Sequence, residues 1–229
     1  MIASLAELTW PAVDPTQTPT LVIALGACEQ HGPHLPFDTD TVIAEALVAR
    51  AVAGVAGVIV GPSIPFGASG EHKDFPGTLS LGTEVLSAVL VELARSAIPP
   101  FERLVVVNGH GGNGEALRQA AVVARRDGRC FEVWSPCVPG GDGHAGRTET
   151  SIMLALDPSR VRTEAIERGN TEPLSALMGK LRRDGVRAHS SNGILGDPTN
   201  ASAEHGHHVL AALTEDLRYF LAATPEPTP

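Results

Sequence analysis

The sequence predicts a single α/β domain with three layers, in which a mostly parallel sheet has helices on both faces. Three observations lead to this prediction: strand and helix patterns alternate along the chain, the predicted strands are continuously apolar, and no linker or repeat divides the 229 residues. Strands covered on both faces have this uniformly apolar character. We therefore assign residues 1–222 to one domain and the Pro-rich residues 223–229 to a disordered tail.

The elements follow from apolar periodicity and turn residues. The runs TLVIAL and RLVVV are typical of buried strands, and we predict strands near residues 21–26, 57–61, 103–107 and 131–135. Segments with helical periodicity predict helices near residues 41–53, 83–97, 114–127, 148–156, 171–184 and 203–222. Asn113 is a suitable N-cap for the third of these helices. Gly- and Pro-rich or Gly- and Ser-rich stretches at 61–78 and 185–202 predict long loops, which are usually functional in compact domains.

Composition excludes several classes of protein. A net charge of −9 argues against nucleic acid or an anionic membrane as a partner. The apolar runs are too short to span a membrane, and the N-terminal residues lack signal-peptide features, so we expect a cytoplasmic protein. The three cysteines form no disulfide or zinc framework. No serine lies in a G-x-S-x-G pattern, which argues against a serine hydrolase.

The segment ALGACEQHGPHLPFDTD, residues 24–40, carries the strongest chemical signal. It follows a predicted strand and contains Glu29, His31, His34, Asp38 and Asp40. On an extended backbone the side chains of Glu29 and His31 point to the same face, and Asp40 comes at the start of the next helix. Carboxylates and an imidazole converging at a strand end suit a divalent transition metal. The alternative is a polar loop whose acids cap the helix.

Two further segments carry similar residues. His110 lies in the Gly-rich turn NGHGGN, directly after the strand predicted at 103–107, where open α/β sheets place their sites. The segment GGDGHAGRTETS offers Asp142, His144 and Glu149. Cys28 adjoins Glu29, but we interpret it as a small hydrophobic residue rather than a ligand.

A dinucleotide site is the competing interpretation of the Gly-rich turn. The motif G-x-G-x-x-G is present, with Glu132 at the end of the next predicted strand. However, His110 occupies the position where the backbone should approach a pyrophosphate, and the cluster at 29–40 would have no role. We therefore favour the metal site.

The motifs EQHGPHLPFDTD, SGEHKDFPGTLSLG, NGHGGN, HAGRTETS and NGILGDPTNASAEHG resemble those of the creatininase family of metal-dependent amidohydrolases. The resemblance covers about residues 5–215 and implies a creatininase-like fold. It is closest to the branch of peptidases that act on the precursor peptide of mycofactocin. That branch implies release of the modified C-terminal Val–Tyr dipeptide after a radical enzyme has acted on the peptide. A small-molecule amidohydrolase or deformylase of the same family is the alternative function.

The resemblance also implies a ligand set. It makes Asp40 the bridge between two divalent ions, Zn, Fe(II) or Mn, with Glu29 and His110 on one ion and His31 on the other. Creatininase has a further Glu ligand where this chain has Gly112, so Glu149 is our candidate to complete the second ion.

The remaining inferences concern catalysis and assembly. A histidine near the metals could pass a proton to the leaving amine. His144 matches a catalytic histidine of the family, and His34, Glu71 and His72 are weaker candidates. The resemblance further implies a closed homo-oligomer, a hexamer or larger.

Overall fold

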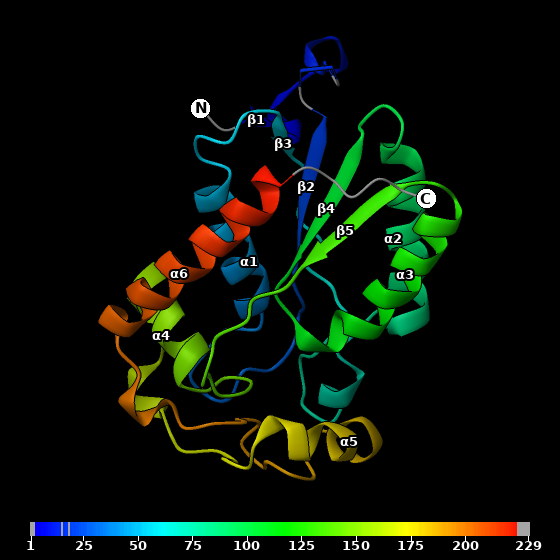
Figure 1. Cartoon of the computed structure of the whole chain (residues 1–229). Helices are drawn as coiled ribbons and strands as arrows, with labels where there is room; N and C mark the ends of the chain where they lie inside the picture. Colours follow the sequence, from blue (N-terminus) through cyan, green and yellow to red (C-terminus); the bar gives the residue numbers. More distant parts are fainter. Residues whose placement is uncertain (1–2, 15, 18, 224–229) are drawn as a thin grey trace.

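The computed structural model describes residues 3–14, 16–17 and 19–223, and within them five strands form one all-parallel sheet (Figure 1). These strands are β1 (Ala3–Ser4), β2 (Thr20–Leu25), β3 (Val58–Val60), β4 (Arg103–Asn108) and β5 (Cys130–Trp134), in the spatial order β1-β3-β2-β4-β5. The predicted parallel α/β fold is confirmed. Only β1 escaped prediction, because a two-residue strand produces no periodic pattern.

The described residues also contain all six predicted helices. They are α1 (Thr39–Ala51), α2 (Thr83–Ala97), α3 (Gly114–Arg126), α4 (Arg147–Leu156), α5 (Leu174–Asp184) and α6 (Ala203–Ala222). The largest error is at α5, which begins at Leu174 rather than at residue 171. Pro173 explains the difference, because a proline disfavours helical geometry in the residue before it. The tail predicted over 223–229 falls, from residue 224 onward, outside the described residues.

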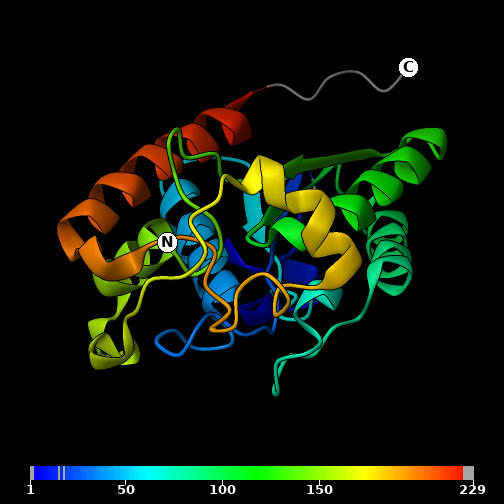
Figure 2. The same cartoon turned by 90° about the horizontal axis from the view of Figure 1, so that it is seen from below.

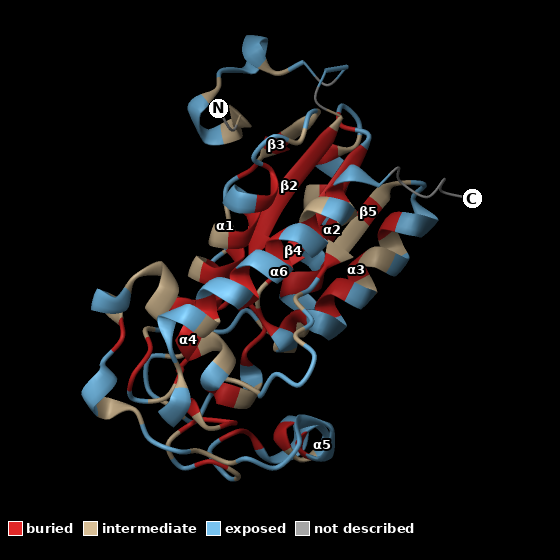
Figure 3. Cartoon of the chain, turned by 60° about the vertical axis from the view of Figure 1, so that its left-hand side comes forward, coloured by how far each residue is buried: buried red, intermediate tan, exposed pale blue. Residues whose placement is uncertain are grey.

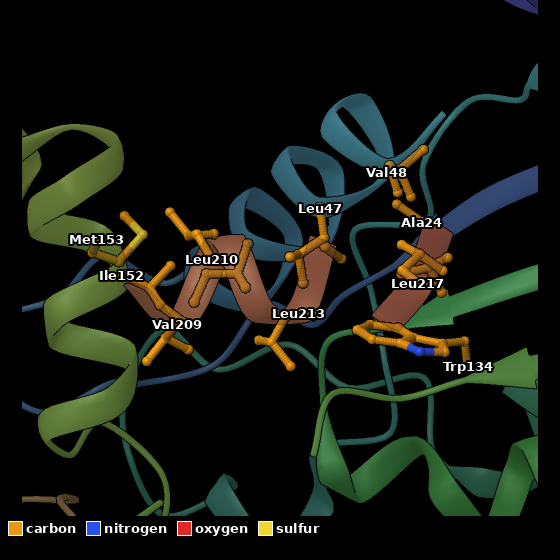
Figure 4. Packing of buried hydrophobic residues seen from close by; sticks show 14 of the residues in the cluster. Ala24, Leu47, Val48, Trp134, Ile152, Met153, Val209, Leu210, Leu213 and Leu217 are labelled. Atoms are coloured by element: carbon orange, nitrogen blue, oxygen red, sulfur yellow. The ribbon is translucent and has the colours of Figure 1, made fainter. Parts of the chain in front are cut away.

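The sheet is buried because its alternate side chains face two different helical layers. From β2, Val22 packs with α1, α4 and α6, whereas Leu21 packs with α2 and α3. Figure 4 shows the first of these layers, where Leu217 of α6 lies next to Trp134. Figure 3 shows that the central strand β2 is buried, whereas β5 at the edge of the sheet is largely intermediate. No helix in the described part of the chain is both long and apolar enough to cross a membrane.

Strand order determines where a site can form. Strand β2 leads through α1 to β3 on one side, while its other neighbour, β4, leads through α3 to β5 on the opposite side. Leu25 and Asn108 end these two strands in register. The segments that follow β2 and β4 therefore diverge at the carboxyl edge, which is the usual place for a site in an open parallel sheet.

Candidate metal centre

Eight of the nine residues predicted as metal or catalytic residues gather at this edge, and six of them form closely spaced groups. Their potential ligand atoms form three overlapping groups, within each of which all atoms lie within 4.8 Å of one another. The groups are Glu29, His31 and Asp40; Glu29, His72 and His144; and His31, His144 and Glu149. His110 joins them through contacts with two of the carboxylates. Residues from five separate segments thus meet at one place.

Asp40 lies at the centre of the cluster. It belongs to the first turn of α1 and is only 2% exposed. Its Oδ1 lies 3.0 Å from His31 Nε2, and its Oδ2 lies 3.4 Å from His110 Nδ1. The two oxygens of one carboxylate therefore face imidazoles from two different segments, as a bridging ligand would require.

Glu29 is fully buried and contacts the remaining histidines. Its Oε2 lies 3.1 Å from His110 Nε2. Its Oε1 lies 3.3 Å from His144 Nδ1 and 3.6 Å from His72 Nε2. Glu149 Oε2 is 3.8 Å from His31 Nε2.

The buried oxygens of this cluster fit divalent metal ions. Within the described residues, both side-chain oxygens of Glu29 and Oδ2 of Asp40 are buried and accept no hydrogen bond of normal geometry. A buried carboxylate is costly unless a counter-charge or a metal satisfies it. The donors are carboxylate oxygens and imidazole nitrogens, a set that suits Zn, Fe(II) and Mn.

The pKa values of His31 and Glu29 show that these two side chains favour their charged forms. Burial opposes protonation of His31, but the Asp40 carboxylate outweighs it and raises the pKa to about 10. Burial likewise disfavours ionised Glu29, yet its histidine neighbours, chiefly His110, hold its pKa well below the usual range. Burial raises the pKa of Glu149 to about 7, against the lowering effect of His31. The positive charge that protonated histidines place beside these carboxylates is one that a bound metal ion would also supply.

Backbone carbonyls orient two of the rings. His31 Nδ1 donates to the carbonyl oxygen of Glu29 at 3.1 Å, which leaves Nε2 free to face Asp40. His144 Nε2 donates to the carbonyl oxygen of Gln30 at 2.6 Å, which leaves Nδ1 facing Glu29. Hydrogen bonds of this kind fix ring orientation and tautomer in metal sites.

Gln30 is a site residue that the sequence did not reveal. Its buried side-chain amide donates to His72 Nδ1 at 2.9 Å and to the carbonyl oxygen of Gly193 at 3.0 Å. On an extended backbone Gln30 would point away from the face shared by Glu29 and His31. Residues 29–31 lie outside any strand, however, so that argument did not apply. Gln30 holds His72 with its Nε2–H directed towards Glu29.

His34 is the predicted residue that the structure leaves out of the cluster. It is 1% exposed, and its Nε2 is paired with Thr150 Oγ1 at 2.8 Å. Burial lowers its pKa to about 4. It links the loop after β2 to α4, so its contribution is to position α4.

The prediction that Asn113 caps α3 is wrong, because its side chain makes no capping hydrogen bond. Its Oδ1 instead accepts from the amide of Ala68 at 2.8 Å, and its Nδ2 donates to the carbonyl oxygen of Gly26 at 3.1 Å. Asn113 is fully buried, and these two hydrogen bonds connect the loops that follow β2, β3 and β4. The alternative in which acids cap α1 also fails, since Asp38 makes no capping hydrogen bond.

A cavity of about 650 Å³ opens above the cluster. Its polar floor is lined by Asp40, Glu71, His72, His110, His144 and Glu149. Helix α5 supplies an apolar wall through Leu174 and Met178, and Figure 2 shows this helix lying across the carboxyl edge of the sheet. The volume is that of a small-molecule or short-peptide site.

Gly112 has no room for a side chain. A Cβ at this position would clash with His110 Nε2 and Glu71 Oε1, and it would lie 2.6 Å from the carbonyl oxygen of Ala68. We expect Gly112→Ala to displace His110 and to lower metal content, measured by elemental analysis of the purified protein. Gly111→Ala is the matched control, because a Cβ there meets nothing within 4 Å. Equal metal content in the two variants would contradict this prediction.

The Gly-rich turn is therefore part of the metal cluster rather than a dinucleotide site. Its histidine faces Glu29 and Asp40. Glu132, the acid that would have bound a ribose, instead forms an ion pair with Arg103.

The fold and the cluster define a class: a metal-dependent amidohydrolase built on a parallel α/β sheet. The sequence model described as creatinine amidohydrolase matches residues 6–221. The chain therefore belongs to the creatininase family, as the motifs indicated.

Individual relatives agree with this assignment. The chain is 48% identical over 224 residues to the mycofactocin precursor peptide peptidase of Mycobacterium tuberculosis, covering 93% of this chain and 89% of that protein. A creatininase structure in a manganese form aligns with a TM-score of 0.79 at 25% identity, covering 96% of this chain and 98% of the other. A mutant creatininase of zinc–zinc type aligns with a TM-score of 0.78 at 24% identity, covering 96% and 97%.

Proposed function

We propose that this protein is a peptidase that hydrolyses the modified mycofactocin precursor peptide and releases its C-terminal Val–Tyr dipeptide. The observation that carries the hydrolytic part is the Asp40 carboxylate, whose two buried oxygens face His31 and His110. The similarity to the mycobacterial peptidase supports the choice of substrate. The cavity, with its polar floor and its apolar wall on α5, suits the end of a peptide chain.

The ligand assignment follows the contacts. Asp40 would lie between two divalent ions, with Glu29 and His110 on one and His31 with Glu149 on the other. When bound, such a pair of ions polarises an amide carbonyl and makes water a competent nucleophile at neutral pH. The sequence and the donor set leave Zn, Fe(II) and Mn open as the native metals.

His144 is our candidate for moving the proton. Its Nε2–H is held by Gln30, so the Nδ1 lone pair faces the cluster and can accept a proton. Burial, with His31 and His72 nearby, holds its pKa well below the usual value, which keeps the ring neutral. His72 has the opposite tautomer, since its Nδ1 accepts from Gln30. The two rings are thus suited to different tasks.

Cleavage assays test the substrate. We expect the protein to remove a C-terminal dipeptide from the modified precursor peptide, detected by mass spectrometry, and to leave creatinine and formamide substrates largely unchanged. Rapid hydrolysis of the small amides with an intact peptide would favour the alternative function of a small-molecule amidohydrolase or deformylase. The homo-oligomer that the resemblance implies stays a prediction.

A further inference from the structure

Glu71 occupies the space that a side chain at position 112 would need. The 3-10 helix Gly70–His72 carries it, and its Oε1 lies so close to Gly112 that a Cβ there would clash with it. The same oxygen is 3.4 Å from His110 Nε2. Glycine at 112 and glutamate at 71 are therefore sterically coupled: the absence of one side chain makes room for the other.

The backbone around Glu71 is fixed. The amide of Val186 donates to the Glu71 carbonyl oxygen at 2.8 Å, and the next residue, His72, is buried against Glu29. The Glu71 side chain is 23% exposed and lines the cavity. It thus borders the cluster on one side and the space for a substrate on the other.

His110 Nε2 lies between two carboxylates. Glu29 Oε2 is 3.1 Å from it and Glu71 Oε1 is 3.4 Å from it. A divalent ion held by Glu29 and His110 would have this second carboxylate beside it.

We propose that Glu71 is a metal ligand, which adds a second carboxylate to the ion held by Glu29 and His110. This inference rests on the proposed two-metal site. Glu71 lies on a different loop from Glu149 and would bind the other ion.

Metal titration tests this proposal without an activity assay. Manganese is added to metal-free wild type, Glu71→Gln and the control Glu115→Gln, with stoichiometry and affinity measured by competition with a chromophoric chelator. Glu115 also lines the cavity, but its carboxylate is held by Arg118 and Gln119. We expect two ions in wild type and in the control. In Glu71→Gln, one ion should bind more than about 100-fold more weakly, beyond the effect of an outer-shell partner.

The possible results separate this inference from the proposed function. Two ions with wild-type affinity in Glu71→Gln would overturn the role of Glu71 and leave the two-metal site intact. Fewer than two ions in wild type would overturn both. Glu71→Ala, checked for wild-type thermal unfolding, should show the same loss of one ion, and electron paramagnetic resonance should change from coupled to isolated Mn(II).

Discussion

Asp40→Ala is expected to lose both metal ions and to reduce turnover by about three orders of magnitude or more. Its two oxygens face His31 and His110 separately, so one substitution removes a ligand from both ions. Metal ions contribute several kcal/mol of transition-state stabilisation, and each 1.4 kcal/mol corresponds to a factor of ten. Elemental analysis and peptide cleavage by the same preparation measure the two losses.

Asp38→Ala is the matched control for this substitution. Asp38 lies two residues earlier at the start of α1 and forms a half-exposed ion pair with Arg160, which contributes little to stability. Full metal occupancy in Asp40→Ala would contradict the bridging role. Glu149→Gln should lose one ion only, and unchanged affinity for that ion would remove Glu149 from the ligand set.

His144→Ala is expected to keep its metal and to lower turnover by about two to four orders of magnitude. This is the usual contribution of a general acid or base. Its Nδ1 faces Glu29, whereas the two oxygens of Asp40 contact His31 and His110. Loss of the His144 ring therefore leaves the contacts of Asp40 in place. Turnover is measured with the precursor peptide and metal content by elemental analysis.

The control for His144 is His189→Ala, which removes a partly exposed imidazole that is paired with Asp184 and is not among the residues lining the cavity. Metal loss in His144→Ala would instead make His144 a ligand, as its grouping with Glu29 and His72 allows. Unchanged turnover with unchanged metal would make it structural and would transfer the proton role to His72.

The predictable parts of this protein are those with strong local patterns. Strands that are buried on both faces are uniformly apolar, and helices that are buried on one face are amphipathic. These two patterns are visible in the sequence, so every helix and four strands could be placed. The site could be anticipated because its acids and histidines follow strand ends, where a parallel sheet brings loops together.

The parts that could not be predicted depend on contacts between distant segments. Gln30 bonds to His72 and to Gly193, and no local pattern shows either partner. Asn113 precedes a helix, as an N-cap residue does, but its side chain instead forms hydrogen bonds with two other loops. His34 is a histidine in the same segment as the ligand candidates Glu29, His31 and Asp40. Its side chain instead pairs with Thr150, a contact that the sequence does not show.

The wall of the cavity has its own small core. Leu177 and Leu181 of α5 pack with Val186 and Leu195 in a cluster separate from the two that flank the sheet. Each of these side chains contributes at most about 1.5–3 kcal/mol when buried, whereas unfolding the sheet would expose both large clusters. This core is also tied to the site, because the amides of Val186 and Leu195 donate to the carbonyl oxygens of Glu71 and His144, each at 2.8 Å. Loss of this small core would therefore change the apolar wall of the cavity and the positions of Glu71 and His144 together.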